Sequence, residues 1–295
     1  MVGAKQSPSL LWHYTTFEGL RGIVTESELF ASSLAYLNDA EEFQYTIEAL
    51  LSLLEEEQKR GTPLAGLIYE NVPEMVRSVF DTQRERLLFV ACFSEERDDL
   101  SQWRSYTPRP PGFAIGFLSD ELRSLATSFG FEMLGCRYPE AAQLRAVIKA
   151  AYDAVTVGMD DENKALPIPA TGTEHEKFIE KWGYKIVEAV IELAKRNKHP
   201  KFAAEKEVRL IGNLIQSIKA GNQFKVDYRL SGSLIVPYVK IPARSTTCER
   251  PSPIKEILVG PCPHQDAVIE VVRQMCIQYD IKAQVDASAI PYRNW

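Results

Sequence analysis

The run Leu87-Leu88-Phe89-Val90-Ala91-Cys92-Phe93-Ser94 is apolar almost from end to end. A continuous run of this length predicts a strand that is buried on both faces. The next apolar run, Phe113 to Phe117, follows the punctuation of Pro108 to Pro111, where proline indicates a turn or loop. We therefore expect a central sheet that contains these two strands.

Toward the N-terminus, Leu10 to Tyr14 predicts another strand, and Thr15-Thr16 then precedes a helix with apolar residues at helical spacing. Leu29 to Ser32 predicts a short second strand. A helix from about residue 41 to 59 is predicted by an apolar stripe at offsets of four, seven, eight and eleven, formed by Phe43, Ile47, Leu50, Leu51 and Leu54.

Toward the C-terminus, helices and strands alternate. We expect strands at residues 131–138, 205–211, 224–228, 234–238, 254–259 and 281–285, and helices at about 120–127, 140–157, 178–190 and 268–276. The fold class is therefore α+β, with a central, mostly antiparallel mixed sheet and flanking helices. Because strands occur at both ends of the sequence, we predict a single domain over residues 1–295 with a helical insertion at about 140–200.

Composition narrows the class of protein. With 295 residues, 45% of them hydrophobic and 25% charged, the chain has the composition of an ordinary globular protein. Its net charge of -6 gives no overall attraction to nucleic acid or to an anionic membrane. No apolar stretch approaches the roughly 20 residues of a membrane helix, and the N-terminus lacks the pattern of a secretion signal. We expect a cytoplasmic protein without membrane contact.

The common catalytic signatures are missing from the sequence. Gly61 to Gly66 and Gly130 to Gly135 have the glycine spacing of a phosphate loop, but Leu67-Ile68 and Cys136-Arg137 follow instead of Lys-Ser/Thr. The five cysteines form no CxxC pair, which is typical of reduced thiols rather than of a disulfide framework or a zinc site. The sequence also lacks GxGxxG, GxSxG and HExxH.

Two strands carry candidate site residues. In the first, alternation places His13 and Thr15 on one face and Tyr14 on the other, so His13 either binds a ligand hydroxyl or bonds to the backbone. In a later strand, alternation places three charged side chains on one face: Glu205, Glu207 and Arg209. They either line a cleft, with the arginine keeping both acids ionised, or form the solvated face of an antiparallel strand.

Two polar segments add further candidates. Ser94 begins a polar-aromatic loop in which Trp103 and Tyr106 either stack on a flat ligand ring or pack the loop down. Asn38 or Asp39 is a natural N-cap for the following helix. Alternatively, four acidic residues could together bind Mg²⁺: Asp39, Glu42, Glu205 and Glu207.

Several short segments, taken in order, resemble the bacterial family known as domain of unknown function 2971. They are His13-Tyr14-Thr15, Leu29 to Ser32, Asn38-Asp39 with Glu42, Cys92-Phe93-Ser94, Trp103, Tyr106, Gly112 to Phe117, Glu205 to Arg209, Gly260-Pro261 and Pro291-Tyr292-Arg293. The sequence departs from the family's pattern at Ala40, where proline is usual, and at Val208, where tryptophan is common.

A more distant resemblance, to ADP-ribosyltransferases, implies a similar core and NAD as the substrate, with no metal. It implies that His13 orients the NAD ribose, that Tyr106 or Trp103 stacks on nicotinamide, and that Glu207 stabilises the ribose cation. Glu205 would position the acceptor nucleophile, on a protein or a nucleic acid. The remaining ligand-binding residues on this hypothesis are Tyr14, Thr15, Ser32, Asn38, Asp39, Ser94 and Arg209.

Two other classes of function stay open. The first is a non-catalytic recognition module of bacterial stress or phage defence, which would use the same cleft for binding alone. The second is a metal-dependent phosphodiesterase or nuclease that uses Asp39, Glu42 and the two late glutamates. Melting temperatures separate the three classes. NAD should stabilise an ADP-ribosyltransferase-like protein, Mg²⁺ or Mn²⁺ should stabilise a phosphodiesterase or nuclease, and neither ligand should stabilise a recognition module.

Overall fold

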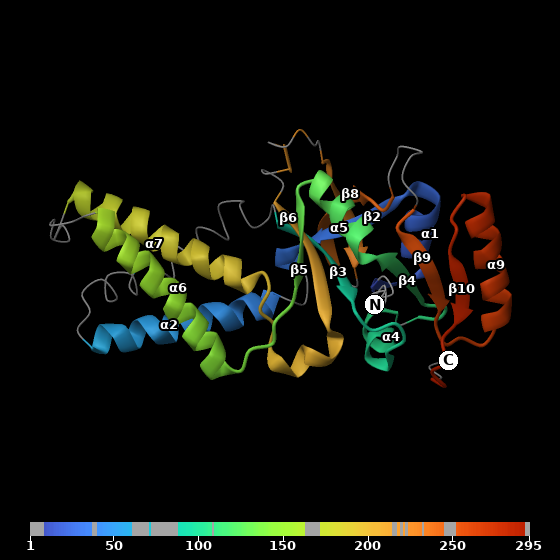
Figure 1. Ribbon diagram of the computed structural model, residues 1–295, viewed down its shortest axis with the longest axis horizontal. Coiled ribbons are helices and arrows are strands. Elements are labelled where there is room, and N and C mark those ends of the chain that lie inside the picture. Colours follow the sequence, from blue (N-terminus) through green and yellow to red (C-terminus); the bar gives the residue numbers. More distant parts are fainter. Residues whose placement is uncertain are drawn as a thin grey trace, which may run out of the picture. The chain divides into compact units, whose positions relative to one another are not determined.

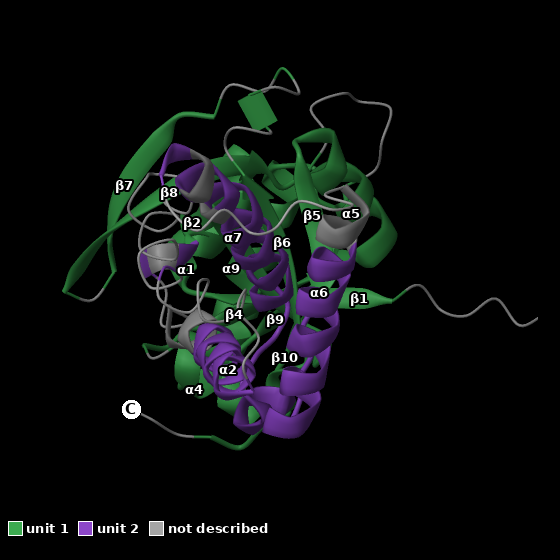
Figure 2. Cartoon of the chain, turned by 90° about the vertical axis from the view of Figure 1, so that its left-hand side faces the viewer, with its two compact units in different colours: residues 1–33, 88–135, 204–295 green, residues 34–87, 136–203 purple. Residues whose placement is uncertain are grey.

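In a computed structural model of the chain, the described residues are 9–36, 40–60, 71, 88–107, 109–162, 172–213, 217–218, 221, 224–231, 233–244 and 252–292. The chain divides into two compact units (Figure 2). Unit 1 comprises residues 1–33, 88–135 and 204–295, and unit 2 comprises residues 34–87 and 136–203. The single domain with a helical insertion stays a prediction.

Unit 1 contains a sheet whose ten described strands are mostly antiparallel (Figure 1). The strands are β1 (Leu10–Thr15), β2 (Glu28–Ser33), β3 (Leu88–Ser94), β4 (Phe113–Leu118), β5 (Phe131–Gly135), β6 (Glu207–Asn213), β7 (Val226–Ser231), β8 (Leu234–Pro242), β9 (Ile254–Val259) and β10 (Gln284–Ala287). Their order is β10-β9-β4-β1-β3-β2-β8-β7, with β6 also paired to β3 and β5 paired to β6. Only β9 and β10 pair in parallel among these strands. The predicted α+β class with a mixed, mostly antiparallel sheet is confirmed.

Helices cover both faces of this sheet. They are α1 (Phe17–Arg21) with its continuation η1 (Gly22–Glu26), α4 (Leu100–Tyr106), α5 (Ser119–Ser128) and α9 (Gln265–Gln278). Apolar residues of α1, η1, α5 and α9 join the main core with one set of alternating strand side chains, such as Phe113 and Ile115. On the opposite face, Trp103 of α4 packs with Trp12 and Tyr14 in a second, smaller cluster.

Unit 2 is helical in its described part. Its helices are η2 (Leu34–Tyr36), α2 (Ala40–Lys59), α6 (Ala141–Glu162) and α7 (Thr173–Ala194). The short helix η3 (Pro200–Glu205) begins in unit 2, ends in unit 1 and leads into β6. The helices α2, α6 and α7 pack against one another. In the stripe predicted for α2, Ile47, Leu50 and Leu54 are buried and Leu51 is half-buried, which confirms the core-facing side of this helix where it is described. No helix in the described part of the chain is long and apolar enough to cross a membrane.

The sheet branches at β3, and this branch positions the candidate site. One edge of β3 pairs with β6 along its whole length, from Leu88 to Ser94. The other edge is shared, because β2 pairs with Phe89 and Val90 while β1 pairs with Ser94. Among the described strands, residues 91–93 therefore have no ladder partner on this second edge.

Two predictions about the local structure around the candidate site are wrong. The segment after Ser94 is a loop only as far as Asp99, because residues 100–106 form α4, and the side chain of Asp99 caps that helix by accepting from the Gln102 amide. The strand expected from residue 205 begins at Glu207 instead. Lys206, between η3 and β6, has a φ of 42°, a left-handed conformation that interrupts the extended chain.

Candidate functional site

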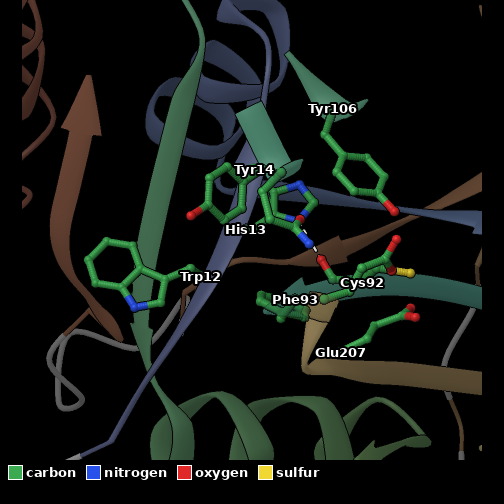
Figure 3. A pocket seen from close by; sticks show the side chains of 9 residues that line it. Trp12, His13, Tyr14, Cys92, Phe93, Tyr106 and Glu207 are labelled. Carbon is green, nitrogen blue, oxygen red and sulfur yellow. Dashed lines mark hydrogen bonds between the residues drawn. The ribbon is translucent and has the colours of Figure 1, made fainter. Parts of the chain in front are cut away.

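Unit 1 contains a pocket of about 70 Å³ (Figure 3). Its walls come from β1, β3, α4 and the junction of η3 with β6, and the lining residues are Trp12, His13, Tyr14, Cys92, Phe93, Gln102, Tyr106, Glu205 and Glu207. Cys92 and Phe93 belong to the part of β3 that β1 and β2 leave unpaired. The pocket therefore lies at the branch in the sheet.

His13 occupies this branch point. Its Nδ1 lies 2.9 Å from the carbonyl oxygen of Cys92, and its ring packs 5.4 Å from that of Phe93, centroid to centroid. A carbonyl oxygen only accepts, so Nδ1 carries the proton and donates it. Burial lowers the pKa of His13 below 6.5, which favours the neutral ring. Neutral His13 therefore offers Nε2 as a hydrogen-bond acceptor.

Glu207 and Arg209 form a buried ion pair at the base of the site. Arg209 Nε donates to Glu207 Oε1 at 2.8 Å, and Arg209 Nη2 donates to Glu207 Oε2 at 3.0 Å. Both side chains are buried, with exposed fractions of 0% for Arg209 and 5% for Glu207. The alternative of a solvated strand face is therefore wrong for these two residues. The two-point contact holds the Glu207 carboxylate in one orientation.

Glu205 reaches the pocket by a different route from the predicted one. It ends η3 rather than sharing a strand face with Glu207, yet it lines the same pocket. The hydroxyl of Ser94 donates to the Glu205 carbonyl at 2.7 Å and accepts from the Glu96 amide at 3.0 Å. Ser94 is 2% exposed, so it positions the backbone beneath the site and offers no group to a ligand.

The helix α4 contributes one predicted residue and one that sequence reasoning missed. Gln102 and Tyr106 are four residues apart, which places them on one helix face, and both line the pocket. Tyr106 is 41% exposed, so its ring is accessible. The sequence analysis assigns no role to Gln102, because it predicts a loop for this segment; helical spacing from Tyr106 would have indicated it.

Trp103 does not line the pocket and packs in the second core cluster. It is 1% exposed, and its Nε1 donates to Asp98 Oδ1 at 2.7 Å. The predicted stacking of Trp103 on a ligand is therefore wrong, because both the ring and its donor are already engaged.

Tyr14 supplies a wall of the pocket. Its hydroxyl donates to the Glu96 carbonyl at 2.9 Å and accepts from the Asp99 amide at 3.1 Å, which ties β1 to the loop before α4. Burial raises the pKa of Tyr14, so the phenol stays protonated. The rings of Tyr14 and Trp103 meet edge to face, with centroids 4.8 Å apart.

The other candidates lie outside the pocket lining or outside the described residues. Thr15 ends β1 and is half-buried, and Ser32 of β2 is buried and accepts from Arg229 Nη2 at 2.9 Å. Asn38 and Asp39, with the side chain of Glu42, fall outside the described residues. Within the described part of the chain, no three His, Cys, Asp or Glu side chains group as metal ligands.

The lining combines hydrogen-bond acceptors with aromatic walls. His13 Nε2 and the carboxylates accept, Gln102 both donates and accepts, and aromatic rings form the sides. Such a lining suits a ligand group that carries hydroxyl donors next to a flat ring. A volume of about 70 Å³ is far below the roughly 300–1,000 Å³ of a site for a drug-sized ligand, so only one small group can enter.

Comparisons with known proteins add a partial family assignment. A family model described as "Protein of unknown function (DUF2971)" matches residues 102–210, so this part of the chain is similar to that family. The matched segment begins in α4 and ends in β6, and it therefore includes Tyr106, Glu205 and Glu207 but not His13. No curated protein and no solved structure gave a significant match to the chain.

Proposed function

We propose that the pocket binds the ribose of NAD and that the chain is an ADP-ribosyltransferase-like or NAD-glycohydrolase-like protein of bacterial stress or phage defence. One observation supports this proposal: His13 of the first strand, Tyr106, Glu205 and Glu207 line a single pocket, although they are far apart in the sequence. The same groups, in the same order, are those that the resemblance to ADP-ribosyltransferases implies.

Hydrogen bonding accounts for recognition of the ribose. Hydroxyl groups of the sugar donate to Nε2 of neutral His13 and to the carboxylate of Glu205, and Gln102 bonds to the carboxamide of nicotinamide. Tyr106 takes the stacking role alone, because its ring is accessible and that of Trp103 is buried. Only the ribose on the nicotinamide side of NAD would enter, since the pocket is small, and the adenine end would lie outside it.

The chemistry requires a negative charge beside the sugar. When the C1′–N bond breaks, nicotinamide leaves with the bonding electron pair, and positive charge develops on the ribose. Glu207, held by Arg209, supplies a fixed carboxylate that stabilises this charge. The oxygen of water or of an acceptor hydroxyl then bonds to C1′, and Glu205 accepts the proton that this oxygen releases.

Release of nicotinamide from labelled NAD tests the proposal directly. We expect release by the wild type and at least about a hundredfold slower release by Glu205→Gln and Glu207→Gln, since general acid–base and electrostatic groups typically contribute that much. Glu132→Gln is the matched control, because Glu132 is an exposed glutamate on β5. Absence of release by the wild type, or equal release by all variants, would contradict the proposal.

A recognition module is the second candidate, and the state of Glu207 favours it. Both carboxylate oxygens of Glu207 are bonded to Arg209, which partly neutralises the charge that catalysis requires. On this alternative, NAD neither raises the melting temperature nor loses nicotinamide. Measuring both quantities on the same sample therefore distinguishes the two functions.

A further inference from the structure

The hairpin of β7 and β8 exposes an apolar surface at the edge of the sheet. Among the described strands, β7 is the last one beyond β8 (Figure 2). Three large apolar side chains on one face of the hairpin are strongly exposed: Tyr228 by 65%, Leu230 by 75% and Ile235 by 65%. Val226 lies on the same face of β7 and packs against the main core. An exposed, apolar edge strand of this kind is a site for pairing with another strand.

The outer edge of β7 has backbone groups in a defined pattern. Tyr228 lies opposite Pro237 of β8, and proline has no N–H to donate to Tyr228. Along one strand of an antiparallel pair, the backbone N–H and C=O groups of successive residues point alternately toward the partner strand and toward the opposite edge. The N–H and C=O of Tyr228 therefore face outward, as do those of Val226 and Leu230. The Tyr228 N–H bonds locally to Asp227 Oδ1 at 2.9 Å, which agrees with this direction.

We propose that two copies of this chain associate by antiparallel pairing of β7 with β7, about a two-fold axis at Tyr228. This register uses the outward backbone groups of residues 226, 228 and 230. It places Val226 opposite Leu230 of the second copy and Tyr228 opposite Tyr228. On the other face it places Asp227 opposite Arg229 of the second copy, twice by symmetry.

The strand is therefore complementary to itself on both faces, with apolar pairs on one and opposite charges on the other. Cross-strand pairs of both kinds stabilise a sheet. In the described part of the chain, neither Asp227 nor Arg229 has an ion-pair partner, but both side chains reach toward β8 or β2, so they turn to the outer edge of β7 when the second copy pairs. Arg229 is oriented by its bond to Ser32 and lies 6.0 Å from the centre of the Tyr238 ring, while Asp227 accepts from the Tyr238 hydroxyl at 3.4 Å.

One strand pair is a small contact compared with the roughly 1,200–2,000 Å² of a standard interface, so the dimer is weak and depends on concentration. Sedimentation velocity over a concentration series measures it. The wild type shifts from monomer to dimer as concentration rises. Asp227→Arg and Arg229→Asp each place like charges opposite each other twice, and each raises the dissociation constant by about tenfold. The double variant restores the opposite charges and recovers dimerisation.

Two further variants complete the test. Leu230→Ser weakens the dimer without changing any charge, because it removes an exposed apolar side chain from the pairing face. Glu132→Arg on β5, a strand that pairs only with β6 in the described sheet, leaves the dissociation constant unchanged. A monomer at every concentration overturns the proposal. So does a dimer that the single charge reversals do not weaken, or a double variant that stays as weak as either single one.

Discussion

Replacing Arg209 by methionine should cause a large loss of stability. The guanidinium is fully buried and donates to both oxygens of Glu207, at 2.8 and 3.0 Å. Methionine fills much of the same volume but leaves the Glu207 carboxylate buried without this cation. Breaking a buried pair by removing one partner costs about 3–5 kcal/mol, a large part of the roughly 5–15 kcal/mol that stabilises a typical domain.

Urea unfolding followed by tryptophan fluorescence measures this loss. Trp12 and Trp103 are buried in unit 1, and Trp182, which is buried in unit 2, should be replaced by phenylalanine throughout so that its signal does not mask theirs. With a slope of about 1–3 kcal/mol per M, the Arg209→Met midpoint should fall by at least about 1 M.

A double-mutant cycle and a surface control separate burial from charge. Glu207→Gln combined with Arg209→Met should destabilise less than Arg209→Met alone, since no buried anion remains. Arg97 also bonds to two acids, Glu256 and Asp286, but its side chain is 44% exposed, so Arg97→Met should cost at most about 1 kcal/mol. If Arg209→Met and Arg97→Met lowered stability equally, the reasoning from burial would be refuted.

Three further predictions concern the walls of the pocket. Ser94→Ala should lower the free energy of unfolding by about 1–3 kcal/mol in urea titrations, because it deletes a buried hydroxyl that both donates and accepts; a loss below about 0.5 kcal/mol would contradict that role. Gly116→Ala should cost about 1–3 kcal/mol, since its Cβ would lie 2.9 Å from the Trp12 ring, whereas Gly135→Ala meets nothing within 4 Å and serves as the control. Stability of the wild type relative to His13→Gln should be greatest above pH 6.5 and fall as pH is lowered toward the depressed pKa of His13, because the unfolded chain takes up the proton first. An equal pH dependence of the two proteins between pH 7 and 5 would show that His13 titrates normally.

Local patterns predicted most of the elements. The apolar run that contains β3 and the stripe of α2 both indicated the right structure. A strand buried on both faces requires a continuous apolar run, and a helix buried on one face requires apolar residues at helical spacing. The prediction failed at residues 100–106, where α4 is short and is fixed by an Asp99 cap and by burial of Trp103. A helix of this length has too few residues to establish a period.

The chemistry of individual side chains was predicted less well. Sequence alternation left Glu207 and Arg209 with two alternatives, a cleft lining or a solvated strand face. The structure decides for burial, because Arg209 and Glu207 are 0% and 5% exposed and bond to each other. A strand that alternates between apolar and charged residues usually exposes its charged face to solvent, and the pattern does not tell when that face is buried instead.

By itself, the sequence determined the α+β class, the positions of the principal strands and the residue types available for a site, since these depend on local propensity and periodicity. Only the tertiary structure decided that His13 and Glu207 line one pocket. That proximity depends on β1 and β6 flanking opposite edges of β3, and on β1 and β2 diverging so that the imidazole bonds to the Cys92 carbonyl. Strand order is set by packing between segments that are distant in the sequence, so the local periodicity of the sequence does not predict it.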